Sequence, residues 1–522
     1  MRFEDQATLN ILAKTSGSVL LLGSSIIMTR FLSKGDYGLY LQAMLLLNTV
    51  TLLSFVGIGQ SIYYYYPQVD DRRAFIRNNL LLGLAVGAVS ALLIYLGKGL
   101  LGHLFRDRAM LEYLPYLCAL LLLQGPTNLK DPIFLSSGAL VPNSALTVVS
   151  SAIDYLPLCL LVMARVGLHW IFAAAVAGRV LNLAIFAAVT RRYCCQPGPA
   201  SSEHPGRRVS LIDQFRYLLP VSAAGYVSTV GKQIDKYVIA NGFSVAQFAT
   251  YSRGATDIPF ISTITYMIND ITLPRYVESY QRRDIRSLVK MMHTNIDKVA
   301  KINFPVFAFL FVEARLFMEI LYTRAYLDSA PIFQVYLLSL LTGVTVYNMI
   351  PTVSGNTRLL LAATTLSVCT TVVSAALLLR LLGPVGVALA TFLGSFSYML
   401  FLLYRSLGIL SLGWREIMPW RNLAKIFTAA LGSTGVVAVF HALLRFLEIG
   451  EGAVTFGLAF GVFAYCYLGA LTLMNLLCRE DRAFLKRWLR FDLFVLMPWV
   501  PKLEETAGAG EEGEAAKDPE VP

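Results

Sequence analysis

The sequence predicts an all-α polytopic membrane protein of about 14 transmembrane helices, with two six-helix lobes related by pseudo-two-fold symmetry plus a C-terminal helix pair. Three observations predict it: the composition, the recurrence of long apolar segments, and an internal repeat. The 522 residues are 56% hydrophobic and only 15% charged, whereas soluble globular proteins carry about a quarter charged residues. This composition excludes a water-soluble enzyme of this length.

Apolar segments long enough to cross a bilayer follow one another along the whole chain. A transmembrane helix needs about 20 mostly apolar residues. Segments that meet this requirement lie at 10–32, 38–66, 78–101, 112–138, 144–166, 168–190, 213–240, 244–273, 295–322, 329–354, 358–382, 384–406, 421–447 and 452–477. Most of the loops between them are short.

These segments divide the chain into lobes and connecting parts. The expected parts are an N-terminal six-helix lobe (1–190), a cytoplasmic linker (191–212), a C-terminal six-helix lobe (213–406), an additional helix pair (407–477), a basic amphipathic cytoplasmic segment (478–503) and an acidic tail (504–522). The tail contains seven acidic residues and one lysine. We expect it to be disordered, because it has too few apolar residues to form a core.

Lysine and arginine counts predict the orientation in the membrane. With the N-terminus inside, the cytoplasmic loops and ends hold 22 of these residues and the opposite loops hold nine. Cytoplasmic loops of membrane proteins carry this excess, so both termini are expected in the cytoplasm. The net charge of +11 thus reflects topology, and no nucleic acid partner is expected.

Three pairs of segments repeat at nearly one spacing. FLSKGDYGLYLQ (31–42) aligns with GFSVAQFATYSR (242–253), which places Tyr40 opposite Tyr251. GLHWIFAAA (167–175) aligns with GPVGVALAT (383–391), and SSGALVPNSALTVVS (136–150) with VSGNTRLLLAATTLS (353–367). The repeat predicts two lobes of the same topology around an axis along the membrane normal, an arrangement typical of transporters with a central site.

Ionisable residues near the middle of predicted spans are candidates for function, since a charge there costs about 2.5–3.5 kcal/mol on insertion scales. These residues are Lys130, Asp154, Arg179 and Asp257. Asp154 and Asp257 are candidates for coupling to a cation or proton, and Arg179 for binding an anionic ligand. Interhelical ion pairs, Arg179 with Asp154 or Lys130 with Asp131, are the alternative.

The seventh predicted span carries a pair of lysines. Lys232 and Lys236 are four residues apart and therefore share a helix face. Their ammonium groups repel each other unless Asp235 or an anion lies between them. Together with Arg30 and Arg253, they are expected to form a cationic, substrate-binding patch in the outer half of a cleft between the lobes. Snorkelling of these side chains to the membrane surface is the alternative.

The order of LSKGDYGLY, IDKYVIANGFSVAQFATYSR and GPVGVALATFLG resembles that in the polysaccharide and O-antigen flippases of the multidrug/oligosaccharidyl-lipid/polysaccharide exporter superfamily. The resemblance covers about residues 1–406. It implies a bacterial inner-membrane flippase that moves a polyprenyl-pyrophosphate-linked glycan outward by alternating access, for O-antigen, capsule or exopolysaccharide synthesis. Membrane lipid and a glycosyltransferase or polymerase are the partners that it implies.

Two other functions stay open at this stage. An exporter of drugs or organic cations belongs to the same superfamily, although its cavity should expose carboxylates rather than a lysine pair. A membrane enzyme or scaffold of polysaccharide synthesis would need a catalytic group on a substantial outer loop, and no such group is found. The five histidines do not cluster, so no catalytic residue, metal site or cofactor is predicted.

Overall fold

The chain forms a bundle of helices, as the composition predicts. This computed structural model describes residues 3–477 except 56, 70, 195–213, 215–224, 228, 257, 346, 448–449 and 451, and every regular element in that part is helical. Eight of its helices are long and apolar enough to cross a membrane. Each of the fourteen predicted segments contains a described helix, which confirms the fold class. The predicted segments 478–503 and 504–522, and most of the linker 191–212, lie outside the described residues.

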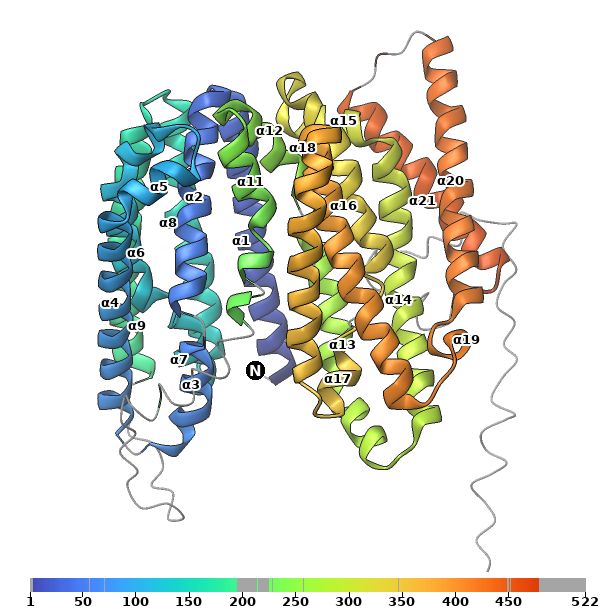
Figure 1. Ribbon diagram of the computed structural model, residues 1–522, viewed down its shortest axis with the longest axis horizontal. Coiled ribbons are helices and arrows are strands. Elements are labelled where there is room, and N and C mark those ends of the chain that lie inside the picture. The colour runs from blue at the N-terminus through green and yellow to red at the C-terminus, as the bar shows by residue number, and fades with distance from the viewer. Residues whose placement is uncertain are drawn as a thin grey trace, which may run out of the picture.

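The N-terminal lobe lies on the left of Figure 1. Its elements are α1 (Phe3–Phe31), α2 (Lys34–Phe55), α3 (Ile58–Tyr65), η1 (Tyr66–Gln68), α4 (Arg72–Leu96), α5 (Lys98–Leu104), η2 (Arg108–Tyr113), α6 (Leu114–Thr127), α7 (Lys130–Ser136), α8 (Leu140–Met163) and α9 (Leu168–Tyr193). Large side chains such as Tyr37, Leu117 and Phe172 fill its core.

The C-terminal lobe lies to the right of the first in Figure 1. Its elements are α11 (Ile234–Gly242), α12 (Val245–Gly254), α13 (Pro259–Gln281), α14 (Ile285–Val312), α15 (Ala314–Tyr322), η3 (Arg324–Ser329), α16 (Ala330–Thr342), α17 (Met349–Val353) and α18 (Arg358–Leu410). The long helix α18 contains two predicted spans. They are separated at Gly383, whose φ of 58° and ψ of −138° turn the chain.

The last helices form the predicted additional pair, α20 (Trp420–Phe446) and α21 (Ala453–Leu473), preceded by α19 (Trp414–Ile417). Two polar contacts attach α20 to the C-terminal lobe. Asn422 Nδ2 donates to Asp297 Oδ2 at 2.7 Å, and His441 Nε2 lies 2.8 Å from Glu313 Oε1. The pair therefore packs on the outside of one lobe, at the right edge of Figure 1.

The internal repeat is visible in how two equivalent helices begin. Ser33 accepts a hydrogen bond from the Asp36 backbone N–H before α2, and Ser244 accepts one from the Gln247 N–H before α12. A serine at this position satisfies a backbone N–H that has no partner within the helix. The two helices also pack closely across the boundary between the lobes, because a Cβ atom on Gly38 would lie 2.2 Å from the Val245 carbonyl oxygen.

Polar contacts join the lobes at one end of the bundle, which we call the closed end and which lies at the top of Figure 1. The Arg106 backbone N–H donates to the Ala240 carbonyl at 3.1 Å, and Asn241 Nδ2 donates to the His103 carbonyl at 2.6 Å. Arg106 also reaches the Gly242 carbonyl at 3.3 Å. The positive-inside count predicts that this end is the outer one.

Candidate functional site

Two membrane spans are interrupted at corresponding places in each lobe. In the N-terminal lobe α2 gives way to α3, and α6 to α7; in the C-terminal lobe α12 gives way to α13, and α16 to α17. Backbone that leaves a helix inside a membrane must be buried in protein or line a hydrated cavity, because lipid offers it no hydrogen bonds. Interrupted helices in both halves of a repeat are a good indicator of a binding site.

The break in the N-terminal lobe between α6 and α7 is occupied by charged groups. Lys130 Nζ donates to the Thr147 hydroxyl at 2.8 Å and lies 3.7 Å from Asp131 Oδ1. Lys14 of α1 approaches the other oxygen of Asp131 at 3.6 Å. The structure thus contains the expected Lys130–Asp131 pair and adds Lys14 to it.

Asp154 and Arg179 form a second ion pair in the same lobe. Arg179 Nη2 of α9 lies 3.4 Å from Asp154 Oδ2 of α8, with side chains that are 31% and 19% exposed. Asn182, one turn along α9, donates Nδ2 to Asp154 Oδ1 at 2.8 Å. Both carboxylate oxygens therefore have a partner. The pairing alternative describes the contacts seen, and the ion-coupling role of Asp154 and the anion-binding role of Arg179 stay predictions.

A carboxylate in the C-terminal lobe is held by hydroxyl groups instead. Asp235 of α11 is only 2% exposed. Tyr251 of α12 donates its hydroxyl to Asp235 Oδ2 at 2.9 Å, and Tyr336 of α16 donates to the same oxygen. The charge of Asp235 is thus directed into its own lobe.

The lysine pair lies on α11 and the turn before it, between the two lobes in Figure 1. Lys232 is exposed and Lys236 is half-buried. Because tyrosines hold Asp235, that carboxylate does not lie between the two ammonium groups. No ion pair involves either lysine within the described part of the chain. Their positive charge is available to an anion.

The two arginines of the expected patch lie at the closed end. Arg253 Nη1 donates to the Ser25 hydroxyl of the other lobe at 2.8 Å, and its guanidinium lies 5.3 Å from the Tyr37 ring centroid and 5.5 Å from that of Tyr322. Arg30 Nη2 donates to the Ile320 carbonyl at 3.0 Å. Both arginines therefore join the lobes. Among the described contacts, none brings them to the lysine pair.

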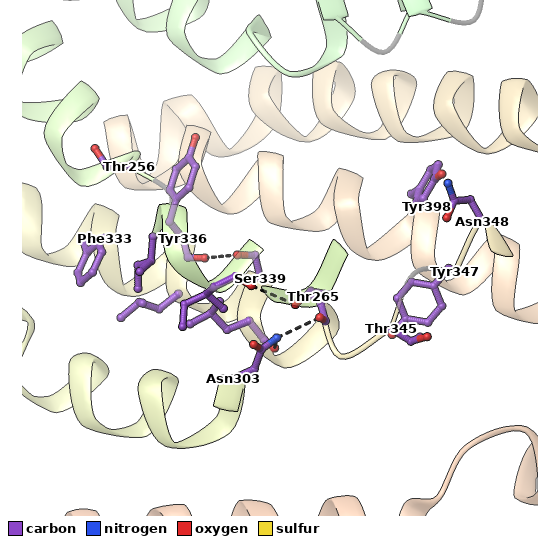
Figure 2. Close-up of a pocket in the computed structure, with 15 residues that line it drawn as sticks. Thr256, Thr265, Asn303, Phe333, Tyr336, Ser339, Thr345, Tyr347, Asn348 and Tyr398 are labelled. Carbon is purple, nitrogen blue, oxygen red and sulfur yellow. Dashed lines mark hydrogen bonds between the residues drawn. The ribbon is translucent and has the colours of Figure 1, made fainter. Parts of the chain in front are cut away.

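A cavity of about 330 Å³ opens inside the C-terminal lobe beside the break between α16 and α17 (Figure 2). It is lined by Asn303 of α14, by residues of the break, by Tyr398 of α18, and by residues from the end of α12 to α13. The polar and aromatic lining consists of Thr256, Thr265, Asn303, Phe333, Tyr336, Ser339, Thr345, Tyr347, Asn348 and Tyr398. This volume is at the lower end of the range for small-molecule sites, about 300–1,000 Å³.

The comparisons with known proteins agree with this architecture. A family described as "Polysaccharide biosynthesis protein" matches residues 27–331, which is more than half of the chain. The chain belongs to this family. No curated protein matches the sequence.

Solved structures similar to this polysaccharide biosynthesis protein share its fold. "Lipid II flippase MurJ, inward closed conformation" is 13% identical with a TM-score of 0.67, over 92% of this chain and 100% of that one. An inward-facing multidrug resistance MATE family transporter of the MOP superfamily is 15% identical with a TM-score of 0.59, over 76% and 95%. A MOP superfamily transporter from Pyrococcus furiosus Vc1 is 15% identical with a TM-score of 0.52, over 78% and 95%.

Several polar residues of this family member were missed by the sequence reasoning. Tyr251 was noted only for the repeat, and Asn182, Asn303, Tyr336 and Asn348 were not singled out. Asparagine inside an apolar span is a usable signal, since a buried amide needs hydrogen-bond partners. Tyrosine gives no such signal in this sequence, because it is common along the whole chain.

Two other predictions have different outcomes in this family member. Asp257 lies outside the described residues, so its ion-coupling role stays a prediction. Within the described residues, no group of three His, Cys, Asp or Glu side chains is placed to hold a metal ion.

Proposed function

We propose that this protein is a flippase that moves polyprenyl-pyrophosphate-linked oligosaccharide across the cytoplasmic membrane, for O-antigen, capsule or exopolysaccharide synthesis. The main support is a chain of the polysaccharide biosynthesis family with two similar lobes that meet through polar contacts at one end. Contacts of this kind break and re-form when lobes rock around a central site. Alternating access would carry the glycan between leaflets.

The physical task defines what the protein must supply. A glycan cannot cross hydrocarbon because its hydroxyl groups would lose their hydrogen bonds to water, whereas a polyprenyl chain stays in the lipid. The protein needs a polar path between its lobes and a positive charge for the pyrophosphate. In this proposal Lys232 and Lys236 supply that charge, since hydrogen bonds between ammonium and phosphate groups are the stronger kind.

The ion pair of the N-terminal lobe is proposed to respond to the coupling ion. Arg179 is engaged by Asp154 at 3.4 Å. A proton or cation on Asp154 would weaken this pair and free Arg179 for the anionic substrate. Asp257 is included in the ion-coupling proposal on sequence grounds. The proposed substrate contacts of Arg30 and Arg253 require the closed end to open, because both arginines are engaged there.

Deletion of the gene in its native host tests the proposal. The deletion strain should lose surface polysaccharide and accumulate lipid-linked oligosaccharide of unchanged structure in the cytoplasmic leaflet, and a plasmid copy should restore both. A shortened or altered lipid-linked glycan would instead identify an enzyme of its synthesis. Normal surface polysaccharide together with raised sensitivity to cationic drugs would identify a drug exporter.

A reversible crosslink tests alternating access in the same strain. Asn241 donates to the backbone of His103 across the lobes at 2.6 Å, so the pair His103→Cys and Asn241→Cys should crosslink under oxidation. Crosslinking should stop glycan export, and reduction should restore it. The two single-cysteine variants are the controls, and full export by the crosslinked protein would contradict rocking at the closed end.

A further inference from the structure

The cavity of the C-terminal lobe is built by a deliberate interruption of a membrane span. Helix α16 ends at Thr342 and α17 begins at Met349, so the intervening backbone lies unwound within a predicted span. The ends of interrupted helices leave carbonyl groups without partners in the helix. Two side chains satisfy these carbonyls here. Asn303 Nδ2 donates to Leu340 and Gly343 at 3.2 and 3.0 Å, and Tyr347 donates its hydroxyl to Thr342 at 2.7 Å.

This arrangement leaves oxygen atoms facing the cavity with unused acceptor capacity. Asn303 is only 2% exposed, and its Oδ1 is buried with no hydrogen-bond partner, as is Oδ1 of Asn348. A buried acceptor without a partner costs about 1–3 kcal/mol. Two such atoms lining one cavity therefore indicate a missing donor.

The hydroxyl groups of the lining reinforce this preference. Thr256 donates to the Ser252 carbonyl at 3.0 Å, and Ser339 donates to the Tyr336 carbonyl at 2.7 Å. A hydroxyl carries one proton but two lone pairs, so a hydroxyl whose proton is used can only accept from a ligand. The described lining contains no Asp, Glu, Lys, Arg or His side chain.

Given these walls, we propose that the cavity binds a neutral sugar unit of the transported glycan, through hydroxyl or acetamido N–H groups that donate to Asn303 and Asn348. The aromatic side chains of Phe333, Tyr336 and Tyr398 in the lining provide the flat, amphipathic surfaces on which an apolar sugar face packs. This inference rests on the proposed function and names the substrate chemistry of the C-terminal lobe: hydrogen-bond donors without charge.

The cavity is also connected to the lysine pair. Tyr336 lines the cavity and donates its hydroxyl to Asp235, which is the residue directly before Lys236. A pyrophosphate at the lysines and the sugars that follow it would thus contact neighbouring elements of one lobe. Binding of a sugar against Tyr336 would bear directly on the helix that carries the lysines.

Saturation-transfer NMR on the purified full-length protein in lipid nanodiscs tests the inference. The probes are N,N′-diacetylchitobiose and maltose as neutral sugars, digalacturonate as an anionic sugar, and sodium chloride exchanged for choline chloride. Both neutral disaccharides, or the acetamido one alone, should receive saturation from the protein. Asn348→Leu should weaken this binding about threefold to tenfold, the effect of losing one hydrogen bond, and Thr345→Trp should abolish it by filling the cavity. Thr352→Val, an exposed neighbour, is the matched control and should bind as the wild type does.

Each other result overturns the inference. These results are no binding of either neutral disaccharide by a protein with wild-type thermal stability, binding of digalacturonate alone, a response to sodium alone, or binding that survives both cavity variants. Glycan export in cells is measured in parallel. Export without disaccharide binding would remove the cavity site and leave the flippase intact, whereas binding without export of any glycan would remove the flippase and leave the sugar site.

Discussion

The two lobes share a topology but differ in the chemistry at their interrupted spans. The break between α6 and α7 carries Lys130 and Asp131, with Lys14 beside them. The break between α16 and α17 carries Asn348, and faces Asn303, with no charged side chain in the described lining of its cavity. Equivalent backbone positions thus serve ionic contacts in one lobe and neutral hydrogen bonds in the other.

The difference shows how each lobe meets the cost of polar groups in a membrane. Charges there need a partner or water, and the N-terminal lobe provides partners by pairing cations with carboxylates. The C-terminal lobe holds its carboxylate Asp235 with tyrosine hydroxyls, which leaves Lys232 and Lys236 without an internal counter-ion. In our proposal the first lobe responds to ions and the second binds the substrate.

The largest effect is expected from removing the lysine pair. The double variant Lys232→Gln and Lys236→Gln should reduce glycan export more than about 100-fold, because each charge-assisted hydrogen bond contributes about 1.5–3 kcal/mol. The measurement is surface polysaccharide at matched levels of protein in the membrane.

Two variants control for charge and for insertion. The double variant Lys98→Gln and Arg380→Gln removes the same charge from exposed positions elsewhere and should export normally, and the double lysine-to-arginine variant should retain most export. Unimpaired export by the glutamine variant would show that the lobes do not divide their roles in this way.

A smaller effect is expected from breaking the Asp154–Arg179 pair. Asp154→Ala should destabilise the protein by about 2–3 kcal/mol, somewhat less than the 3–5 kcal/mol typical of fully buried pairs, because these side chains are 19% and 31% exposed. The double variant Asp154→Leu and Arg179→Leu should be less destabilised than either single change. Thermal unfolding in nanodiscs measures both.

The conservative variant Asp154→Asn separates the pair's structural role from coupling. It should fold and change how export depends on pH or sodium, whereas the apolar double variant should lose that dependence altogether. An unchanged dependence in Asp154→Asn would assign the pair to structure alone.

The C-terminal break should be more sensitive to its neutral amide than to a charge. Asn303→Leu should destabilise the protein by about 2 kcal/mol, since the Leu340 and Gly343 carbonyls lose their shared donor. Asn356→Leu, an exposed change in the same lobe, should stay within about 0.5 kcal/mol. Equal thermal stability of the two variants would mean that another donor replaces the amide.

Much of the fold could be predicted because hydrophobic length and periodicity determine it. The repeat around Tyr40 and Tyr251 identified α2 and α12 as equivalent, and both helices do begin after a capping serine. The interruptions were not predicted, because segments such as 329–354 are apolar throughout. A break that is satisfied by side chains from other helices leaves little trace in the local sequence.

The candidate site was only partly predictable for a related reason. A charge inside an apolar span identifies itself, so Asp154 and Arg179 were named together and do form a pair. The orientation of Asp235 was not predictable, because it depends on Tyr251 and Tyr336 from distant helices. Arg253 was expected beside the lysines, yet it contacts Ser25 across the lobes, a contact that no spacing in one helix reveals.

The smallest effect separates the lobes at the turn between their last two spans. Gly383 has φ of 58° and ψ of −138°, a conformation that is costly for a residue with a Cβ atom, so Gly383→Ala should destabilise by about 1–2 kcal/mol. The turn of the N-terminal lobe instead carries Arg165 with φ of 55°. Relief of strain in Arg165→Gly is opposed by the greater freedom that glycine gives the unfolded chain, so thermal stability should change by less than about 1 kcal/mol. Equal losses in the two variants would show that the lobes turn by the same means.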